Sequence, residues 1–301
     1  MSAQADAEAV YRACKGFGTD ESTLIKILGH RDWAQLQSIS QWYQHLKGED
    51  MLDRLRRETS GDFGRALVDG CKHPVVYDAE LIHGASKGLG TSEGVIIEVL
   101  IRRSNEDIQM LNQTYTAMYH TNLTSVMRSE FSGNAQYLFS TICLGQRQPG
   151  VFDPVPDADA LQRCFHGDIR TDEVTLIHIL TGRSDEHLRN VFNVYMQRYQ
   201  ARIEDMVRRH TSGDLQRGLV ALVKCVQDAP LYVAEILESA MAGLGTNERR
   251  LSRVTIRNRG PFMEHVKLSY LHRYGKTLRR RIEGDTSGDY RKLLLAYIND
   301  S

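Results

Sequence analysis

Three glycine-rich loops share a fixed spacing to an acidic residue, and this pairing could bind a hard metal ion. The loops read KGFGT from Lys15, KGLGT from Lys87 and AGLGT from Ala242. The interval from the first glycine to the acid is the same in all three: Gly16 to Glu58, Gly88 to Glu130 and Gly243 to Asp285. Glycine reaches positive φ without steric cost and leaves neighbouring carbonyls unscreened, and Ca²⁺ takes carbonyl and carboxylate oxygens. The constant interval therefore favours calcium ligation over three unrelated surface acids.

A fourth copy of the loop is degraded. It reads HGDIRTDE from His166, has one extra residue, and carries Arg170 where the second glycine belongs. Its turn supplies His210 instead of an acid. A guanidinium and a neutral imidazole do not offer the oxygen ligands of a hard dication, so we expect no site of this type there.

Two further markers indicate that the chain consists of four repeats, each of about 70 residues. The turns ETSGD, EFSGN, HTSGD and DTSGD begin at Glu58, Glu130, His210 and Asp285. The second marker is a tyrosine in each repeat: Tyr43, Tyr115, Tyr195 and Tyr270. Each tyrosine precedes its turn by the same interval, and chance does not produce this agreement four times. We expect the four tyrosines in the core, without a functional role.

The pattern inside each repeat is helical. Apolar residues recur at +3, +4 and +3 in the second repeat, at Ile108, Leu111, Tyr115 and Met118. Ser104 with Asp107 predicts a capping box. The threonines that follow the glycine loops are predicted as helix N-caps: Thr19, Thr91 and Thr246. About five helices of ordinary length fit in each repeat.

The step from the second repeat to the third is longer than the other two, and a longer connection explains it. The stretch from Gly145 to Asp159 holds three of the six prolines and is predicted as a linker between two halves. The predicted domains are repeat 1 at 4–73, repeat 2 at 74–146, a linker at 147–156, repeat 3 at 157–228 and repeat 4 at 229–301. An arginine recurs at one fixed place after the loop threonine in the first three repeats, at Arg31, Arg103 and Arg183. Asn258 stands at this place in the fourth, so its local packing is expected to differ.

Composition excludes several classes of protein. Lys+Arg and Asp+Glu balance at 38 each, so net charge gives no attraction to nucleic acid. No apolar run reaches the ~18 residues of a membrane span, and the start lacks the pattern of a secretory signal, which predicts a cytoplasmic protein. The 5 cysteines show no CxxC spacing, so neither a disulfide framework nor a zinc site is expected. GxxxxGK[ST] is absent and no nucleophile–base pair stands out, so we predict neither an enzyme nor a small-molecule substrate.

The repeated loop, with its acid at a constant distance downstream, closely resembles the annexin family over essentially the whole chain. The resemblance implies an all-α fold in which each repeat is a right-handed superhelix of five helices, with the calcium loops on one convex face. It also implies a core preceded by a minimal N-terminal tail.

The resemblance assigns three loop carbonyls and one turn carboxylate to each calcium site. The implied ligands are Cys14, Gly16, Gly18 and Glu58; Ser86, Gly88, Gly90 and Glu130; and Met241, Gly243, Gly245 and Asp285. Minor sites beside the loops would use Thr19 with Glu21 and Thr91 with Glu93. The apolar residues at the loop tips are predicted to contact the membrane: Phe17, Leu89 and Leu244.

The implied function is calcium-dependent, reversible binding to acidic phospholipid membranes, with Ca²⁺ bridging the protein oxygens and lipid phosphates. A helical-repeat scaffold for protein partners is an alternative, but it does not explain the constant interval between loop and acid. A calcium-gated ion pathway, lined by Glu98 and Arg103, is a further alternative. Self-association on membranes is left open.

Overall fold

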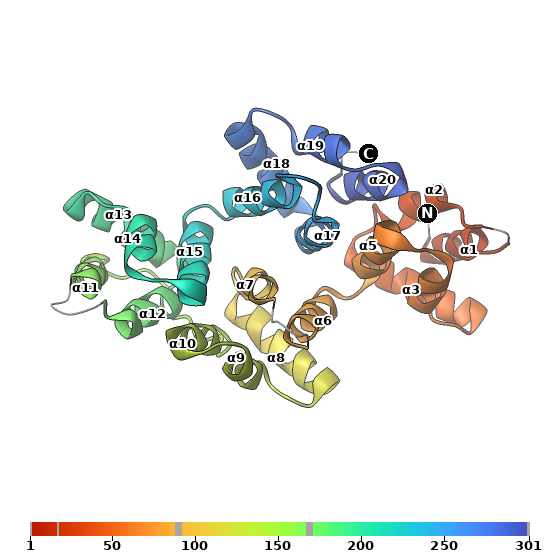
Figure 1. The fold of residues 1–301 in the computed structure, drawn as a ribbon. Helices are drawn as coiled ribbons and strands as arrows, with labels where there is room; N and C mark the ends of the chain where they lie inside the picture. Colours follow the sequence, from red (N-terminus) through yellow and green to blue (C-terminus); the bar gives the residue numbers. More distant parts are fainter. Residues whose placement is uncertain (1, 17, 88–91, 167–170, 300–301) are drawn as a thin grey trace. The chain divides into compact units, whose positions relative to one another are not determined.

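The protein is described by a computed structural model covering residues 2–16, 18–87, 92–166 and 171–299. These ranges hold twenty α-helices (Figure 1), and their one β-type pairing is an isolated bridge between Gln148 and Arg183. The prediction of an all-α fold with five helices in each repeat is confirmed. No helix in this part of the chain is long and apolar enough to cross a membrane.

The helices follow one another with short connections. The first repeat contains α1 (Ala3–Ala13), α2 (Glu21–Leu28), α3 (Trp33–Lys47), α4 (Met51–Glu58) and α5 (Gly61–Cys71). The second contains α6 (Pro74–Ser86), α7 (Glu93–Leu100), α8 (Asn105–Tyr119), α9 (Leu123–Glu130) and α10 (Gly133–Ile142). The third contains α11 (Val155–Phe165), α12 (Glu173–Gly182), α13 (Asp185–Tyr199), α14 (Ile203–His210) and α15 (Gly213–Gln227). The fourth contains α16 (Ala229–Met241), α17 (Glu248–Arg257), α18 (Pro261–Tyr274), α19 (Leu278–Asp285) and α20 (Gly288–Tyr297).

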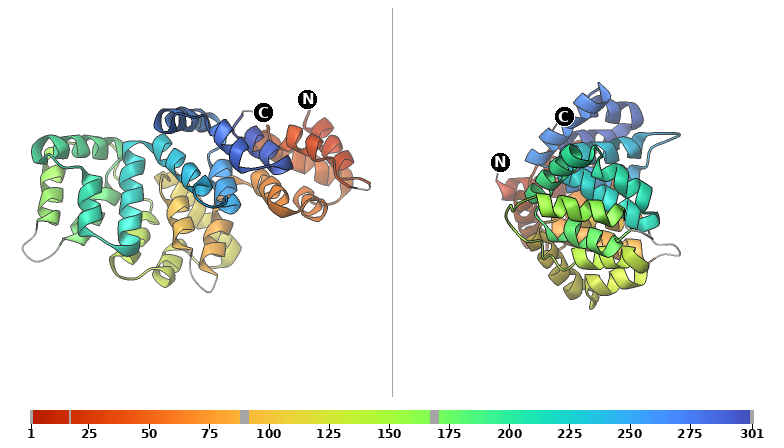
Figure 2. Two further views of the ribbon diagram at one scale, coloured as in Figure 1. Left: turned by 45° about the horizontal axis from the view of Figure 1, so that its top comes forward. Right: turned by 90° about the vertical axis from the view of Figure 1, so that its left-hand side faces the viewer.

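The repeats pair into two compact units (Figures 1 and 2). One unit contains residues 1–74 and 230–301, and the other contains residues 75–229. The first repeat therefore packs with the fourth, and the second packs with the third. The proline-rich linker lies inside the second unit, so the expectation that it separates two halves is wrong.

The two units use the same packing pattern. In the first unit, α2 packs on α20, α5 packs on α17, and α5 also packs on α20. In the second unit, α7 packs on α15, α10 packs on α12, and α10 packs on α15. Gly218 allows a close approach in the second unit, because a Cβ atom there would lie 2.6 Å from the ring of Phe139. The second helix of each repeat thus buries its apolar face against the fifth helix of its partner.

The core contains the residues that the sequence places there. Each repeat buries its marker tyrosine almost completely: Tyr43, Tyr115, Tyr195 and Tyr270. The Tyr195 hydroxyl donates a hydrogen bond of 2.6 Å to Gln162, which satisfies its polar end inside the third repeat. All five cysteines are free and buried, in agreement with a packing role.

The helix caps confirm one prediction and correct another. Ser104 and Asp107 form the expected capping box at the start of α8. Thr19 and Thr246 are not N-caps, because the residue after each of them takes that position, and Thr91 lies outside the described residues. Asp20 caps α2, Ser92 occupies the N-cap of α7, and Asn247 caps α17. The hydroxyls of Thr19 and Thr246 instead donate to the backbone carbonyls of Glu58 and Asp285.

Hydrogen bonds attach the linker to the third repeat. The Phe152 N–H donates to His187 Nδ1 over 3.2 Å, so Nε2 carries the proton that His187 donates to Asp157 over 3.0 Å. The Ser184 hydroxyl donates to the Gly150 carbonyl over 2.7 Å. Helix α11 begins at Val155, within the predicted linker.

The arginine that recurs after the loop forms the same ion pair in three repeats. Arg31 pairs with Asp6 at 2.8 Å, Arg183 pairs with Asp157 at 2.7 Å, and Arg103 pairs with Asp78. In the fourth repeat, Asn258 is buried and donates to the Val254 carbonyl. The neighbouring Arg259 instead donates to carbonyls of the first repeat, among them Gly70 and Arg31 at 2.9 Å each. The local packing of the fourth repeat thus differs as expected, and Arg259 in this segment holds the fourth repeat against the first.

Candidate functional site

The first and fourth loops have the backbone that the glycines were predicted to allow. Gly16 and Gly18 have φ of 120° and 90°, and Gly243 and Gly245 have φ of 99° and 91°. A Cβ atom added at any of the four would meet nothing within 4 Å, so conformation and not space requires glycine. All four glycines are exposed.

Each loop is closed by a hydrogen bond across its base. The amide of the residue after the threonine donates to a carbonyl at the end of the preceding helix: Asp20 to Ala13, Ser92 to Ala85, Asp172 to Cys164 and Asn247 to Ala240, at 2.7–3.2 Å. The bond spans seven residues in three loops and eight in the third. The extra residue of the third loop is therefore contained between unchanged anchor points.

The loop threonine ties the loop to the turn that carries the acid. The Thr19 hydroxyl donates to the Glu58 carbonyl over 2.8 Å, and the Thr246 hydroxyl contacts both the carbonyl and the carboxylate of Asp285 at 3.1 Å. Thr171 makes the same contact with the His210 carbonyl at 3.3 Å. In all three repeats this bond joins two segments that are far apart along the chain.

In the first repeat, an arginine lies between the loop and the acid. Arg54 Nη2 donates to the Cys14 carbonyl over 2.6 Å and lies 3.1 Å from Glu58 Oε1. Burial, together with the carboxylates of Glu58 and Glu49, raises the pKa of the Cys14 thiol to about 11. The thiol is therefore protonated at neutral pH, and the carbonyl is the group of Cys14 that suits a hard cation.

The fourth repeat contains the same arrangement with one more carboxylate. Arg281 donates to the Met241 carbonyl through Nη2, to Asp285 through Nη1, and to Glu238 through Nε at 3.1 Å. The core Tyr270 hydroxyl also donates to Glu238. Two acids and one loop carbonyl thus converge on a single guanidinium.

The second and third repeats differ from this arrangement. In the second, Ser86 ends α6 and Glu130 ends α9, where Glu130 accepts a hydrogen bond of 3.1 Å from Ser129. Gly88, Leu89, Gly90 and Thr91 lie outside the described residues. In the third, His210 is half-buried and its ring centroid lies 5.5 Å from that of Phe165. Arg170 also lies outside the described residues.

The remaining predicted residues lie beside the loops. Leu244 is fully exposed at the tip of the fourth loop, at 110% of its reference accessibility, whereas Phe17 lies outside the described residues. Glu21 begins α2, and Glu93 begins α7 with its carboxylate 3.7 Å from Arg217 of the third repeat. The Thr19 hydroxyl donates its hydrogen to the Glu58 carbonyl in the turn, and this bond leaves the lone pairs of the hydroxyl oxygen unused.

The donors of the first and fourth loops fit a calcium ion. In both, a loop carbonyl and the turn carboxylate already converge on a positively charged group, which acts as a stand-in cation. Carbonyl and carboxylate oxygens are the hard ligands that Ca²⁺ prefers. The sequence predictions did not include the arginines, although their place four residues before the acid in α4 and α19 could have drawn attention to them.

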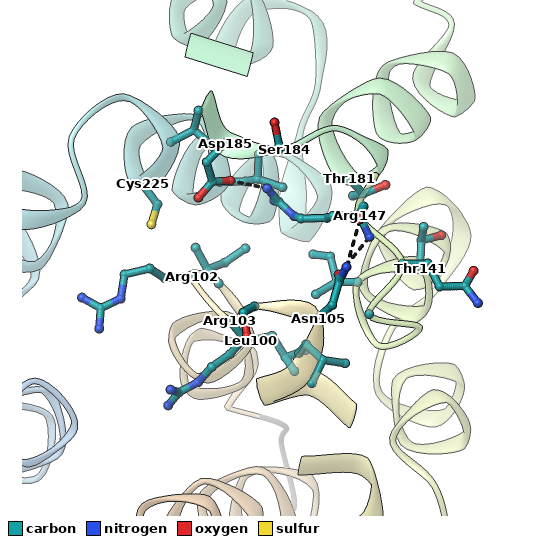
Figure 3. Close-up of a pocket in the computed structure, with 18 of the residues that line it drawn as sticks. Leu100, Arg102, Arg103, Asn105, Thr141, Arg147, Thr181, Ser184, Asp185 and Cys225 are labelled. Carbon is teal, nitrogen blue, oxygen red and sulfur yellow. Dashed lines mark hydrogen bonds and ion pairs between the residues drawn. The ribbon is translucent and has the colours of Figure 1, made fainter. Parts of the chain in front are cut away.

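A cavity of about 410 Å³ lies elsewhere in the second unit, between the α7–α8 connection, the linker and α15 (Figure 3). Its arginines are engaged, because Arg103 pairs with Asp78 and Arg147 pairs with Asp185. Burial raises the pKa of the Cys225 thiol on its wall to about 12, so this thiol is not a nucleophile at neutral pH. The cavity offers no activated nucleophile among the residues described around it.

Comparison with known proteins agrees with the repeat structure. The profile of the family described as Annexin matches residues 5–69, 77–142, 156–222 and 232–297. Annexin A4 of Canis lupus familiaris is 38% identical over 299 residues, which cover 98% of this chain and 94% of that protein. Annexin A5 of Gallus gallus is 38% identical, with coverage of 98% and 93%.

Solved structures give the same result. A structure of annexin III superposes with a TM-score of 0.97 at 33% identity, covering 100% of this chain and 94% of that chain. Chicken annexin V in complex with Zn²⁺ gives 0.94 at 38% identity, with coverage of 100% and 96%. A calcium-bound annexin (Sm)1 gives 0.89 at 28% identity, with coverage of 99% and 90%.

Proposed function

Because this chain belongs to the annexin family, we propose that it binds acidic phospholipid membranes reversibly and in a calcium-dependent manner. The observation that carries the proposal is the convergence of a loop carbonyl and the turn carboxylate on one cation in the first and fourth repeats. The second repeat has the same motif, with Glu130 as its acid. Calcium-bound annexin (Sm)1 is a relative whose structure contains the metal.

The proposed calcium ligands are the loop carbonyls and acids assigned from the sequence: Cys14, Gly16, Gly18 and Glu58; Ser86, Gly88, Gly90 and Glu130; and Met241, Gly243, Gly245 and Asp285. When bound, calcium supplies positive charge, and phosphate oxygens of the lipid complete the coordination shell of the ion. The chain itself has a formal net charge of zero, so its own charge does not draw it to an anionic surface. Leu244, exposed at the loop tip, would insert at the headgroup boundary.

We also propose that the protein acts by binding and not by catalysis, and that it moves between the cytoplasm and membrane surfaces. Calcium and lipid affinities are linked, so each ligand must raise the affinity for the other by the same factor. Calcium affinity is thus expected to be low in solution and higher in the presence of acidic lipid.

Co-sedimentation with liposomes tests the function directly. We expect the protein to sediment with phosphatidylserine vesicles in calcium and to return to the supernatant when EGTA is added. Equal sedimentation with and without calcium would refute the proposal and favour a scaffold that binds partners through its helices.

A pair of variants tests the assignment of the sites. Asp285→Asn removes the acid of the fourth site and should raise the calcium concentration for half-maximal vesicle binding roughly three- to tenfold. His210→Ala, the matched change at the equivalent position of the third repeat, should leave it unchanged. If both variants shift the midpoint equally, the distinction between the third and fourth repeats is wrong.

A further inference from the structure

The two arginines near the candidate sites occupy equivalent positions in their repeats. Arg54 lies four residues before Glu58 on α4, and Arg281 lies four residues before Asp285 on α19. Each donates to the carbonyl of the residue at the end of the helix before its loop, Cys14 or Met241. The same geometry in separate repeats indicates an arrangement built into the chain and not a chance surface ion pair.

The guanidinium contacts two oxygens that are assigned to calcium. A guanidinium that holds a carbonyl and a carboxylate competes with a divalent ion for these oxygens, because the two cations repel each other at such close range and draw on the same negative charge. The side chains of Arg54 and Glu58 are each 25% exposed, and those of Arg281 and Asp285 are 18% and 16% exposed. Water therefore screens these contacts only in part.

The two contacts differ in quality. Arg281 uses Nε, Nη1 and Nη2, with Glu238 as an additional anionic partner. Arg54 uses Nη2, while its Nε is buried without a hydrogen-bond partner among the described residues. An unsatisfied buried donor weakens the arginine's hold on its position. Arg54 is therefore easier to displace than Arg281.

The other two repeats have no arginine at this position. Val126 stands four residues before Glu130, and Met206 stands four residues before His210, both buried. The second repeat thus keeps the loop and the acid without a guanidinium from this place on the helix.

We propose that Arg54 and Arg281 are internal competitors of calcium, each held in the place of the ion until the ion displaces it. The inference rests on the proposed function, because it concerns the same ligands. It gives the three sites different calcium requirements: the second site binds without displacing an arginine from this position, and the first and fourth bind only by exchange. Each exchange adds the two positive charges of calcium and also releases the guanidinium from its acidic partner. The attraction of the protein to an anionic membrane therefore rises steeply with the calcium concentration.

Arginine-to-methionine variants test this proposal, because methionine keeps an unbranched apolar stem and removes the charge. Calcium binding is measured by calorimetry in the presence of soluble short-chain phosphatidylserine. Arg281→Met should lower the calcium concentration for half-saturation of its site by about tenfold, and Arg54→Met should lower it by about threefold. Arg280→Met removes an equal charge from an exposed neighbour and should change neither value. Arg281→Lys, which keeps the charge but loses the forked contact, should give an intermediate shift.

Thermal unfolding in EGTA provides a second readout that does not depend on bound metal. Arg281→Met leaves Glu238 and Asp285 without their shared cation, so its midpoint should fall below that of the parent protein, and calcium should restore it. The inference would be overturned if the parent protein binds vesicles in calcium and both Arg281→Met and Arg54→Met reach half-saturation at the same calcium concentration as the parent. The proposed function would then still stand. Vesicle binding by the parent protein that is independent of calcium would overturn both.

Discussion

Arg259 provides a quantitative test of how the first and fourth repeats are held together. Its guanidinium donates to four carbonyls of the first repeat, with the shortest contacts of 2.9 Å to Gly70 and Arg31. It also lies 4.1 Å from the ring centroid of Tyr297. Arg259→Met keeps most of the apolar stem and removes these interactions, so the resulting loss of stability can be attributed to the guanidinium.

The magnitude follows from the contacts. Two short hydrogen bonds from a charged donor contribute at least about 1.5 kcal/mol each. The cation–π contact adds roughly 0.5–1 kcal/mol at a partly exposed site. The expected loss is about 3.5–4 kcal/mol, which corresponds to a fall in the melting midpoint of roughly 7–16 °C for a unit of this size.

Thermal unfolding in EGTA measures this effect in the absence of metal. Arg249→Met is the matched control, because Arg249 is an exposed arginine of α17, the helix that ends just before Arg259, and its midpoint should change by less than about 2 °C. Hydrogen exchange should show faster exchange in α5 and α20 of Arg259→Met, but not in α10 and α15. A midpoint for Arg259→Met equal to that of the control would refute the view that this arginine joins the two repeats.

Two further predictions concern the exposed loop tip and the acid beside the linker. Leu244→Ser should weaken vesicle binding by about tenfold or more, since a buried leucine contributes roughly 1.5–3 kcal/mol, while circular dichroism and the matched variant Leu268→Ser stay at parent values. Unfolding of Leu244→Ser would show that this residue is part of the core. Burial raises the pKa of Asp157, but hydrogen bonds from Arg183 and His187 outweigh it and hold that pKa below the ordinary value of 3.8. A carboxylate whose pKa is lowered by folding stabilises the fold at pH values above its unfolded pKa, and this stabilisation is lost as the pH falls through its folded pKa. Asp157→Asn should therefore lower the melting midpoint at pH 7, and the midpoints of the variant and the parent protein should converge in acid. A constant difference between the two midpoints from pH 7 to about 3 would contradict this.

The repeats, the helical fold and the loop backbone could be predicted because their signals are local or periodic. Two glycines in one loop indicate positive φ, and the constant interval between loop and turn indicates which acid belongs to which loop. The core tyrosines could be recognised from their helical spacing. Each of these inferences needed only one repeat or the comparison of repeats along the chain.

The features that could not be predicted are contacts between distant segments. The threonine hydroxyls were assigned to helix caps, but Thr19 donates to the carbonyl of Glu58, at the far end of α4. The pairing of Arg54 with Glu58 is local, whereas its contact with the Cys14 carbonyl depends on how α4 packs against the loop. Apolar periodicity likewise shows which helix face is buried, but not which repeat covers it. The pairing of the first repeat with the fourth was therefore missed.

That pairing has a consequence for the order in which the protein is made. Residues 1–74 bury their apolar faces against residues 230–301, and the Tyr297 hydroxyl donates to the Ala66 carbonyl over 3.0 Å. The second and third repeats are continuous in the chain and can pack together as soon as residue 229 has left the ribosome. At about 5–20 residues per second, the first repeat waits roughly 10–45 s until its partner is complete. During that time the faces of α2 and α5 that later contact α20 and α17 lack their partner helices, so the first repeat completes its packing only after the fourth repeat has been made.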